Sequence, residues 1–211
     1  MTFLRSVDRL LQRTALWRRV RAHSRFRDAL GFAPTLWTRK VADEQVRELV
    51  RALDPARLSA LEISGEVWRS YGFGEYRSVN YPKFDICAQV LKERFDLIIA
   101  EHVFEHLLWP CRAGRNVCEM LRPGGRLLVV TPFIYKVHAN PYDCTRWTET
   151  GLRYLLAECG FALGGIKTGS WGNRAVIEST FRWEYTLFNR HVHSLENDPD
   201  LPIVVWALAQ K

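Results

Sequence analysis

Short apolar runs and amphipathic segments alternate along most of the chain. Runs of buried-type residues predict strands at 59–64, 76–80, 95–100 and 126–133, and two more within 161–170 and 203–210. Apolar residues at helical spacing predict helices at 38–55, at roughly 101–121 and at 149–159. Strands that alternate with helices favour an α/β fold, with a mostly parallel sheet covered on both faces.

The N-terminal segment differs from the rest in its charge. Residues 1–27 carry eight arginines and a single acid, Asp8, and their apolar residues recur at helical spacing. We therefore divide the chain into a basic helical N-terminal extension, 1–55, and a main α/β domain, 56–211. The basic helix suits an anionic membrane surface, an acidic carrier protein or, with less support, a nucleic acid. The simpler alternative is a helix that packs on the main domain and leaves its arginines in solvent.

Composition narrows the class of protein. The 211 residues are 47% hydrophobic and 25% charged, which is typical of a globular chain. The longest apolar runs are strand-sized, and arginines interrupt the N-terminus, so we expect neither a membrane span nor a secretion signal. Five scattered cysteines without a C-x-x-C pair favour reduced thiols. We expect a cytoplasmic protein, with attachment to a membrane surface as an open alternative.

The stretch "HVFEH", residues 102–106, has the H-x-x-E-H spacing of inverted zinc proteases. That motif requires a long helix and a distant acidic ligand, whereas here the residues directly follow a buried strand. We therefore expect no metal site. His102 is interpreted as lining a pocket, and His106 as a residue that packs or caps a helix.

Four motifs occur in order at the predicted strand ends: "ALEISG", "FDLIIAEHVFEHL", "LRPGGRLLVVTPF" and "HANPYDCTRWTETGLRYLLAECGF". Together, from about residue 59 to residue 168, they resemble the class I S-adenosylmethionine-dependent methyltransferases. The resemblance implies a Rossmann-like fold, with residues 56–211 as an S-adenosylmethionine-binding methyltransferase domain. The absence of G-x-G-x-x-G after the first strand argues against a nicotinamide dehydrogenase.

The resemblance also implies a cofactor site for S-adenosyl-L-methionine at the carboxyl ends of the strands. The residues it places there are Glu62, Ile63, Ser64, Gly65, Asn80, Tyr81, Asp85, Ile86, Ala100, Glu101 and His102. Three features depart from the family pattern. The glycine loop is short, the usual acidic ribose ligand is replaced by Asn80, and about thirty residues separate the first strand from "FDLIIA".

Candidate catalytic residues follow the strand expected at 126–133. His138 is the candidate general base, because an imidazole titrates near neutral pH and the acceptor is expected to enter there. Asp143 and Arg146 are spaced to pair and to fix that loop. Aromatic residues expected to wall the acceptor pocket are Tyr135, Tyr142, Trp147 and Trp171.

We expect methyl transfer to a small molecule or a sugar (glycan) acceptor, at a hydroxyl group. The competing hypothesis is a catalytically inactive protein of the same fold that acts as a binding scaffold, attached to a membrane surface through its arginine-rich helix. The sequence leaves the oligomeric state open.

Overall fold

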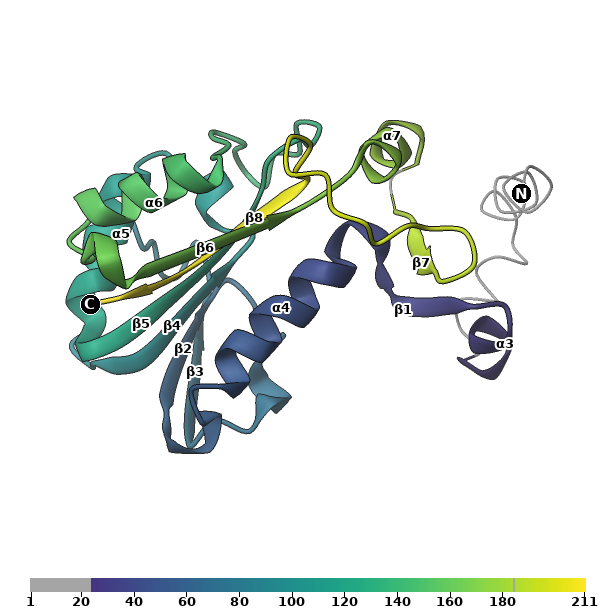
Figure 1. The fold of residues 1–211 in the computed structure, drawn as a ribbon. Helices are drawn as coiled ribbons and strands as arrows, with labels where there is room; N and C mark the ends of the chain where they lie inside the picture. The colour runs from purple at the N-terminus through teal and green to yellow at the C-terminus, as the bar shows by residue number, and fades with distance from the viewer. Residues whose placement is uncertain (1–23, 184) are drawn as a thin grey trace.

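The computed structural model describes residues 24–183 and 185–211, and a six-stranded sheet forms its centre (Figure 1). The order across the sheet is β3-β2-β4-β5-β8-β6. Strands β2 to β5 pair in parallel, whereas β8 is antiparallel to both of its neighbours. The strands are β2 (Ser59–Ile63), β3 (Glu75–Val79), β4 (Phe95–Glu101), β5 (Leu121–Pro132), β6 (Ile166–Trp171) and β8 (Val204–Gln210). The mostly parallel sheet predicted from the sequence is confirmed.

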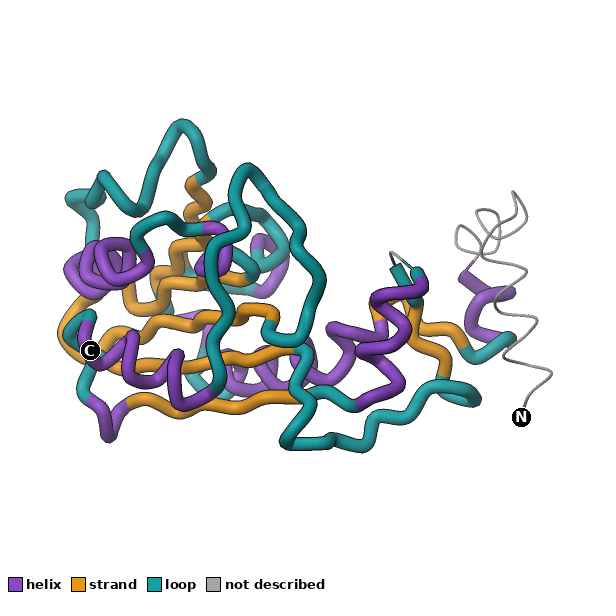
Figure 2. The backbone as a smooth tube through the Cα atoms, turned by 90° about the horizontal axis from the view of Figure 1, so that it is seen from above, coloured by secondary structure: helices purple, strands orange, loops and turns teal. Residues whose placement is uncertain are grey.

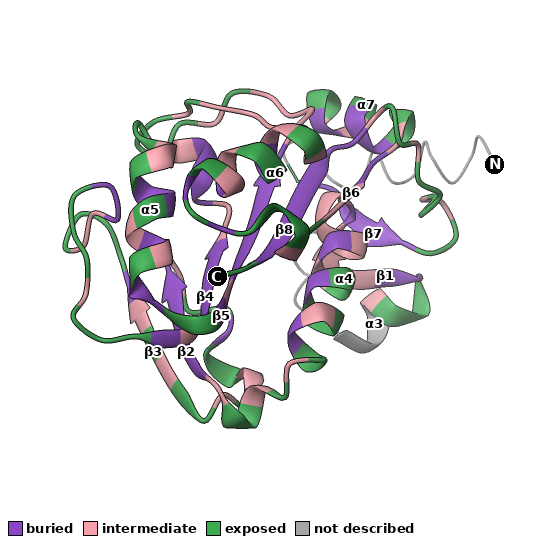
Figure 3. Ribbon diagram, turned by 60° about the vertical axis from the view of Figure 1, so that its left-hand side comes forward, coloured by how far each residue is buried: buried purple, intermediate pink, exposed green. Residues whose placement is uncertain are grey.

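Helices cover both faces of this sheet (Figures 1 and 3). One hydrophobic cluster joins the sheet to α5 (Pro110–Met120) and α6 (Glu149–Glu158), and a second joins it to α4 (Lys40–Arg51) and α7 (Arg174–Arg182). Strand β4 supplies both clusters, because side chains alternate along a strand. Ile98 belongs to the first cluster, and Leu97 and Ile99 belong to the second.

The winding of the sheet reverses next to β2. The chain passes from β2 to β3 on one side and then returns to β4 on the other side. In parallel sheets, this reversal opens a crevice at the carboxyl ends of the strands. Turns without a helix fill the stretch from β3 to β4, as the short spacing in the sequence predicts.

The prediction of a helix over about 101–121 is wrong for residues 101–109. After β4 the chain bends at His102, which has a φ of 54°, and forms a 3-10 turn at Phe104–His106. The α-helix begins only at Pro110. Proline is favoured at the first position of a helix because its missing N–H would lack a partner there in any case. The residues of "HVFEH" therefore lie on a loop at the edge of the sheet.

A smaller sheet lies beyond α4, away from the main sheet (Figures 1 and 2). Strand β1 (Phe32–Leu36) pairs antiparallel with β7 (Leu187–Asn189), and α3 (Ser24–Ala29) precedes it. Most of the basic helix predicted over 1–27 lies outside the described residues. Among the described residues, no helix combines the length and the hydrophobicity needed to span a bilayer.

Helix α4 belongs to the core of the main sheet, although the boundary placed at residue 55 separates them. Val50 is fully buried in the cluster that also holds Leu97. We expect Val50→Ala to lower the free energy of unfolding by about 2 kcal/mol, since it removes packed methyl groups. Glu48→Ala, on the exposed side of the same helix, should change it little. Urea denaturation measures both, and equal effects would show that α4 is not part of this core.

Candidate active site

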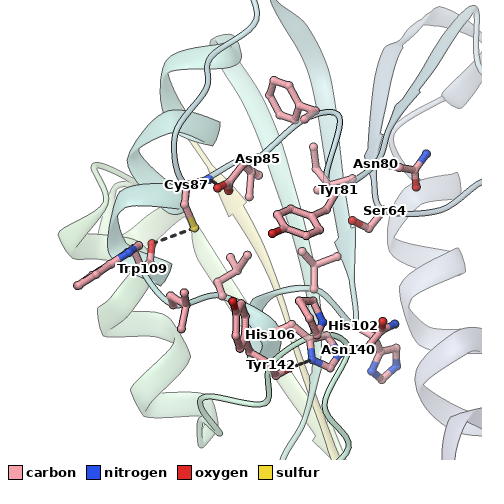
Figure 4. Close-up of a pocket in the computed structure, with 17 residues that line it drawn as sticks. Ser64, Asn80, Tyr81, Asp85, Cys87, His102, His106, Trp109, Asn140 and Tyr142 are labelled. Carbon is pink, nitrogen blue, oxygen red and sulfur yellow. Dashed lines mark hydrogen bonds between the residues drawn. The ribbon is translucent and has the colours of Figure 1, made fainter.

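A pocket of about 450 Å³ opens at the carboxyl ends of β2, β3 and β4, where the winding of the sheet reverses (Figure 4). Four segments line it, and each directly follows a strand or belongs to the loop after β5. They contribute Ile63 and Ser64; Asn80, Tyr81 and Phe84 to Cys87; His102, Val103 and His106 to Trp109; and Asn140 to Tyr142. A volume of this size accommodates one small ligand.

The turn after β2 is organised by Glu62. Its buried carboxylate accepts hydrogen bonds from the backbone N–H groups of Val67 and Trp68, both at 3.0 Å, and from the Tyr76 hydroxyl at 2.5 Å. Burial, together with this contact to Glu62, raises the pKa of Tyr76 well above its usual value. Glu62 therefore shapes the turn and is not among the residues that line the pocket.

Gly65 belongs to the same turn and also lies behind the pocket lining. A Cβ atom at this position would lie 2.6 Å from Glu62 Oε1, so only glycine fits without displacing the carboxylate. Ser64, next to it, lines the pocket with a φ of 60°, a left-handed conformation that glycine adopts more readily. The chain thus forms its turn with a serine at the strained position.

The segment after β3 forms one wall of the pocket. Asn80 is exposed, and its amide nitrogen donates to Ser78 Oγ at 3.3 Å. Asp85 Oδ1 accepts from the backbone N–H of Cys87 at 2.8 Å, which holds the turn that buries Ile86. Figure 4 shows Asp85 and Cys87 near Trp109, with His102 and His106 at another end of the pocket.

Of the three predicted residues at the end of β4, only His102 lines the pocket. Ala100 is fully buried within the sheet. Glu101 forms an ion pair with Arg39 and accepts a hydrogen bond from Trp68 Nε1 at 2.9 Å. This carboxylate connects the segment before α4 to the edge of the sheet.

Three histidines surround one buried carboxylate beside the pocket. Glu105 is fully buried, and its Oε1 lies 3.4 Å from His102 Nδ1, 3.7 Å from His106 Nε2 and 3.9 Å from His138 Nε2. Its other oxygen accepts from Thr131 Oγ1 at 3.3 Å. The role of Glu105 and the position of His106 in the pocket wall were not predicted from the sequence. The signal was a glutamate next to Phe104 in an apolar stretch.

The loop after β5 holds the predicted base. Asp143 and Arg146 form the expected ion pair, and Asp143 Oδ2 also accepts from the backbone N–H of His138 at 2.7 Å. The Arg146 guanidinium holds the pKa of Asp143 well below its usual range. The His138 ring packs edge-on against His106, with centroids 5.1 Å apart, so it reaches the pocket through that residue.

The four predicted aromatic residues occupy different places. Tyr142 lines the pocket and is 48% exposed. Tyr135 packs on the His138 ring and Trp147 packs on Phe104, both outside the pocket lining.

The prediction that Trp171 walls the acceptor pocket is wrong. It is 2% exposed, lies in the cluster with α4 and α7, and donates from Nε1 to the Leu195 carbonyl at 3.0 Å. Alternation along β6 turns its side chain into this core.

Comparisons with known proteins agree with the fold. The sequence profile of a methyltransferase domain family matches residues 21–198, most of the chain. No curated protein sequence matches.

Solved structures share the fold at low sequence identity. An S-adenosylmethionine-dependent methyltransferase from Mesorhizobium loti is 16% identical, with a TM-score of 0.52, covering 78% of this chain and 96% of that one. A putative sarcosine dimethylglycine methyltransferase from Galdieria sulphuraria is 10% identical, with a TM-score of 0.53, covering 81% and 85%. A methyltransferase from Archaeoglobus fulgidus is 13% identical, with a TM-score of 0.51, covering 80% and 94%.

These matches bear on the hypotheses drawn from the sequence. They confirm the Rossmann-like fold, and the profile match favours an enzyme over an inactive scaffold. S-adenosylmethionine is the methyl donor of the class I enzymes whose fold the chain shares. The chain belongs to the methyltransferase domain family.

Proposed function

We propose that the protein transfers a methyl group from S-adenosylmethionine to a hydroxyl of a small-molecule or sugar acceptor. The observation that carries this proposal is the group of imidazoles at one end of the pocket. His102 and His106 line it, and His138 packs on His106. A hydroxyl is a weak nucleophile, so its methylation benefits from a base near neutral pH. An amine acceptor would need such a base less.

The pocket residues suit the parts of the cofactor. The Asn80 amide can hydrogen-bond the ribose hydroxyls, although with a neutral group, and buried Ile86 with half-buried Phe84 offers an apolar surface for the adenine. Ser64 and His102, at the ends of β2 and β4, would flank the methionine part. The acceptor then occupies the end near Tyr142 and the histidines.

The bound cofactor supplies an electrophilic methyl carbon on a sulfonium. Transfer of this methyl group to the acceptor oxygen, with loss of the S–CH₃ bond, would give S-adenosylhomocysteine, a methyl ether and one proton. His138 would accept that proton. Its Nδ1 lies 3.2 Å from the Lys136 carbonyl and 3.4 Å from both Asp143 Oδ2 and Arg146 Nη2. The two acceptors favour a proton on Nδ1, which leaves Nε2 to receive another.

Substitution of His138 tests the proposed role. We expect His138→Ala to lower kcat by about 10²- to 10⁴-fold. Because His138 does not line the pocket, the affinity for S-adenosylhomocysteine should stay within about twofold. The assay follows the tritiated methyl of S-adenosylmethionine onto a panel of hydroxyl, amine and thiol compounds. Labelling of amines alone, or an unchanged kcat in the variant, would contradict the proposal.

A partner for the basic segment stays a prediction. Residues 1–23, which carry most of its arginines, lie outside the described residues. An anionic membrane surface or an acidic carrier of the acceptor would suit this charge.

A further inference from the structure

We infer that Glu105, His106 and His138 form a binding site for one divalent transition-metal ion of the zinc type. This inference deepens the proposed function, since the site lies at the end of the pocket assigned to the acceptor. The ligand atoms would be Glu105 Oε1, His106 Nε2 and His138 Nε2. One ligand atom from each of the three residues lies within 4.8 Å of the other two, and the residues come from the loop after β4 and the loop after β5.

The hydrogen-bond partners of the two histidines fix where their protons lie. His106 Nδ1 lies 2.6 Å from the Tyr142 carbonyl (Figure 4), and His138 Nδ1 lies 3.2 Å from the Lys136 carbonyl. A carbonyl oxygen can only accept, which favours a proton on each Nδ1 of the neutral rings. At His138 Nδ1 the Asp143 Oδ2 acceptor, at 3.4 Å, favours the same tautomer, whereas the Arg146 Nη2 donor, also at 3.4 Å, opposes it. Each Nε2 therefore presents a lone pair, and both lone-pair atoms lie within 4 Å of Glu105 Oε1.

This arrangement is unfavourable without a cation. Glu105 Oε1 is buried and has no hydrogen-bond partner among the described residues. The nearest possible donor, His102 Nδ1, lies 3.4 Å away, beyond the usual hydrogen-bond distance, so the charge of a buried oxygen that faces two lone pairs is poorly compensated. A proton shared with either ring would require a shorter contact than 3.7 or 3.9 Å. A water molecule has only two protons for the three acceptors.

A metal ion satisfies all three atoms together. Two atoms bonded to one zinc ion at about 2.1 Å lie about 3.4 Å apart in tetrahedral geometry, close to the separations of 3.7 and 3.9 Å found here. Two imidazoles and a carboxylate are typical ligands of zinc-type ions. The Asp143 carboxylate, 3.4 Å from His138 Nδ1, and the Tyr142 carbonyl would orient the ligating rings, as outer-shell acceptors do in metal sites.

The proposed site is not the inverted zinc-protease motif, H-x-x-E-H, that the sequence shows at residues 102–106. That motif pairs His102 with His106 on one helix, whereas here His102 stands on a bend at the end of β4. The pair that meets is His106 with His138, from separate loops. Three protein ligands leave one position open. An acceptor hydroxyl bound there would become more acidic. With the ion bound, His138 Nε2 is a ligand and the proton would pass to water; without the ion, His138 keeps the role of base proposed above.

Cobalt titration tests the site without an activity assay. We would remove metals from the full chain with a chelator, add CoCl₂ and record the visible absorption that Co²⁺ shows in a tetrahedral site. We expect one Co²⁺ per chain, displaced by Zn²⁺, with binding weakened about 100-fold or more in His138→Ala and Glu105→Gln. His191→Ala, at an exposed histidine outside the cluster, should bind as the wild type does.

His138→Ala is the deciding variant. The His138 side chain is 33% exposed, so its removal should leave the fold intact, which circular dichroism can verify. No binding to the wild type at millimolar Co²⁺, or equal binding to His138→Ala, would overturn the inference. A parallel titration with S-adenosylhomocysteine separates this failure from failure of the proposed function, since the cofactor should bind whether or not the metal does.

Discussion

Replacement of Glu62 by alanine should lower the free energy of unfolding by about 2–4 kcal/mol, because it removes the acceptor of three donors, of which the Trp68 N–H is buried. The carboxylate accepts from Val67 N, Trp68 N and Tyr76 Oη, and it is 3% exposed. These three donors come from the turn after β2 and from β3, so the variant should also loosen the turn that carries Ser64. Denaturation in urea, followed by circular dichroism, measures the loss.

Two further variants sharpen this test. Glu62→Gln keeps the size and one acceptor oxygen, so it should lie between alanine and the wild type. Glu66→Ala removes an exposed carboxylate a few residues along the same segment, where its partner is Arg69, and should leave stability unchanged. If Glu62→Ala and Glu66→Ala were equally stable, the carboxylate of Glu62 would not organise the turn.

Replacement of Gly65 by alanine should weaken the binding of S-adenosylhomocysteine by about tenfold or more, which corresponds to about 1.4 kcal/mol or more of binding free energy. The new Cβ would lie 2.6 Å from Glu62 Oε1, which is closer than a carbon and an oxygen can approach. Either the carboxylate moves and releases its donors, or the turn moves and Ser64 leaves its place in the pocket. Both changes alter the wall beside the proposed methionine position.

Gly164→Ala is the matched control for Gly65→Ala. No atom lies within 4 Å of the position that its Cβ would take, and the residue is remote from the pocket lining. Calorimetric titration of both folded variants separates the effect of the turn from the general effect of adding a methyl group. An unchanged affinity in Gly65→Ala would show that the turn after β2 does not touch the cofactor.

The sequence was sufficient for the sheet, because each central strand is an apolar run that the structure buries on both faces. The sequence was less informative about where a helix begins and about which way a side chain at a strand end points. Pro110 is a helix start in the structure, although the apolar pattern continued back to residue 101. Trp171 ends β6, where a pocket residue could stand, yet the direction of its side chain depends on which face of β6 meets α4 and α7.

The cluster around Glu105 could not be predicted from local pattern alone. His106 and His138 lie on loops far apart in the sequence. They meet because β4 and β5 are parallel neighbours whose following segments leave the same edge of the sheet. The roles of Glu62 and Glu101 depended equally on packing. Their carboxylates bind protein donors, although the family resemblance had placed both residues in the cofactor site.

We propose that the pocket at the ends of β2, β3 and β4 binds S-adenosylmethionine. Calorimetric titration of the wild type with S-adenosylhomocysteine, beside Gly65→Ala and Gly164→Ala, tests it most directly. We predict one site per chain with a dissociation constant on the order of micromolar, weakened in Gly65→Ala and unchanged in Gly164→Ala. Absence of binding at millimolar ligand, or equal affinity in all three proteins, would contradict the account.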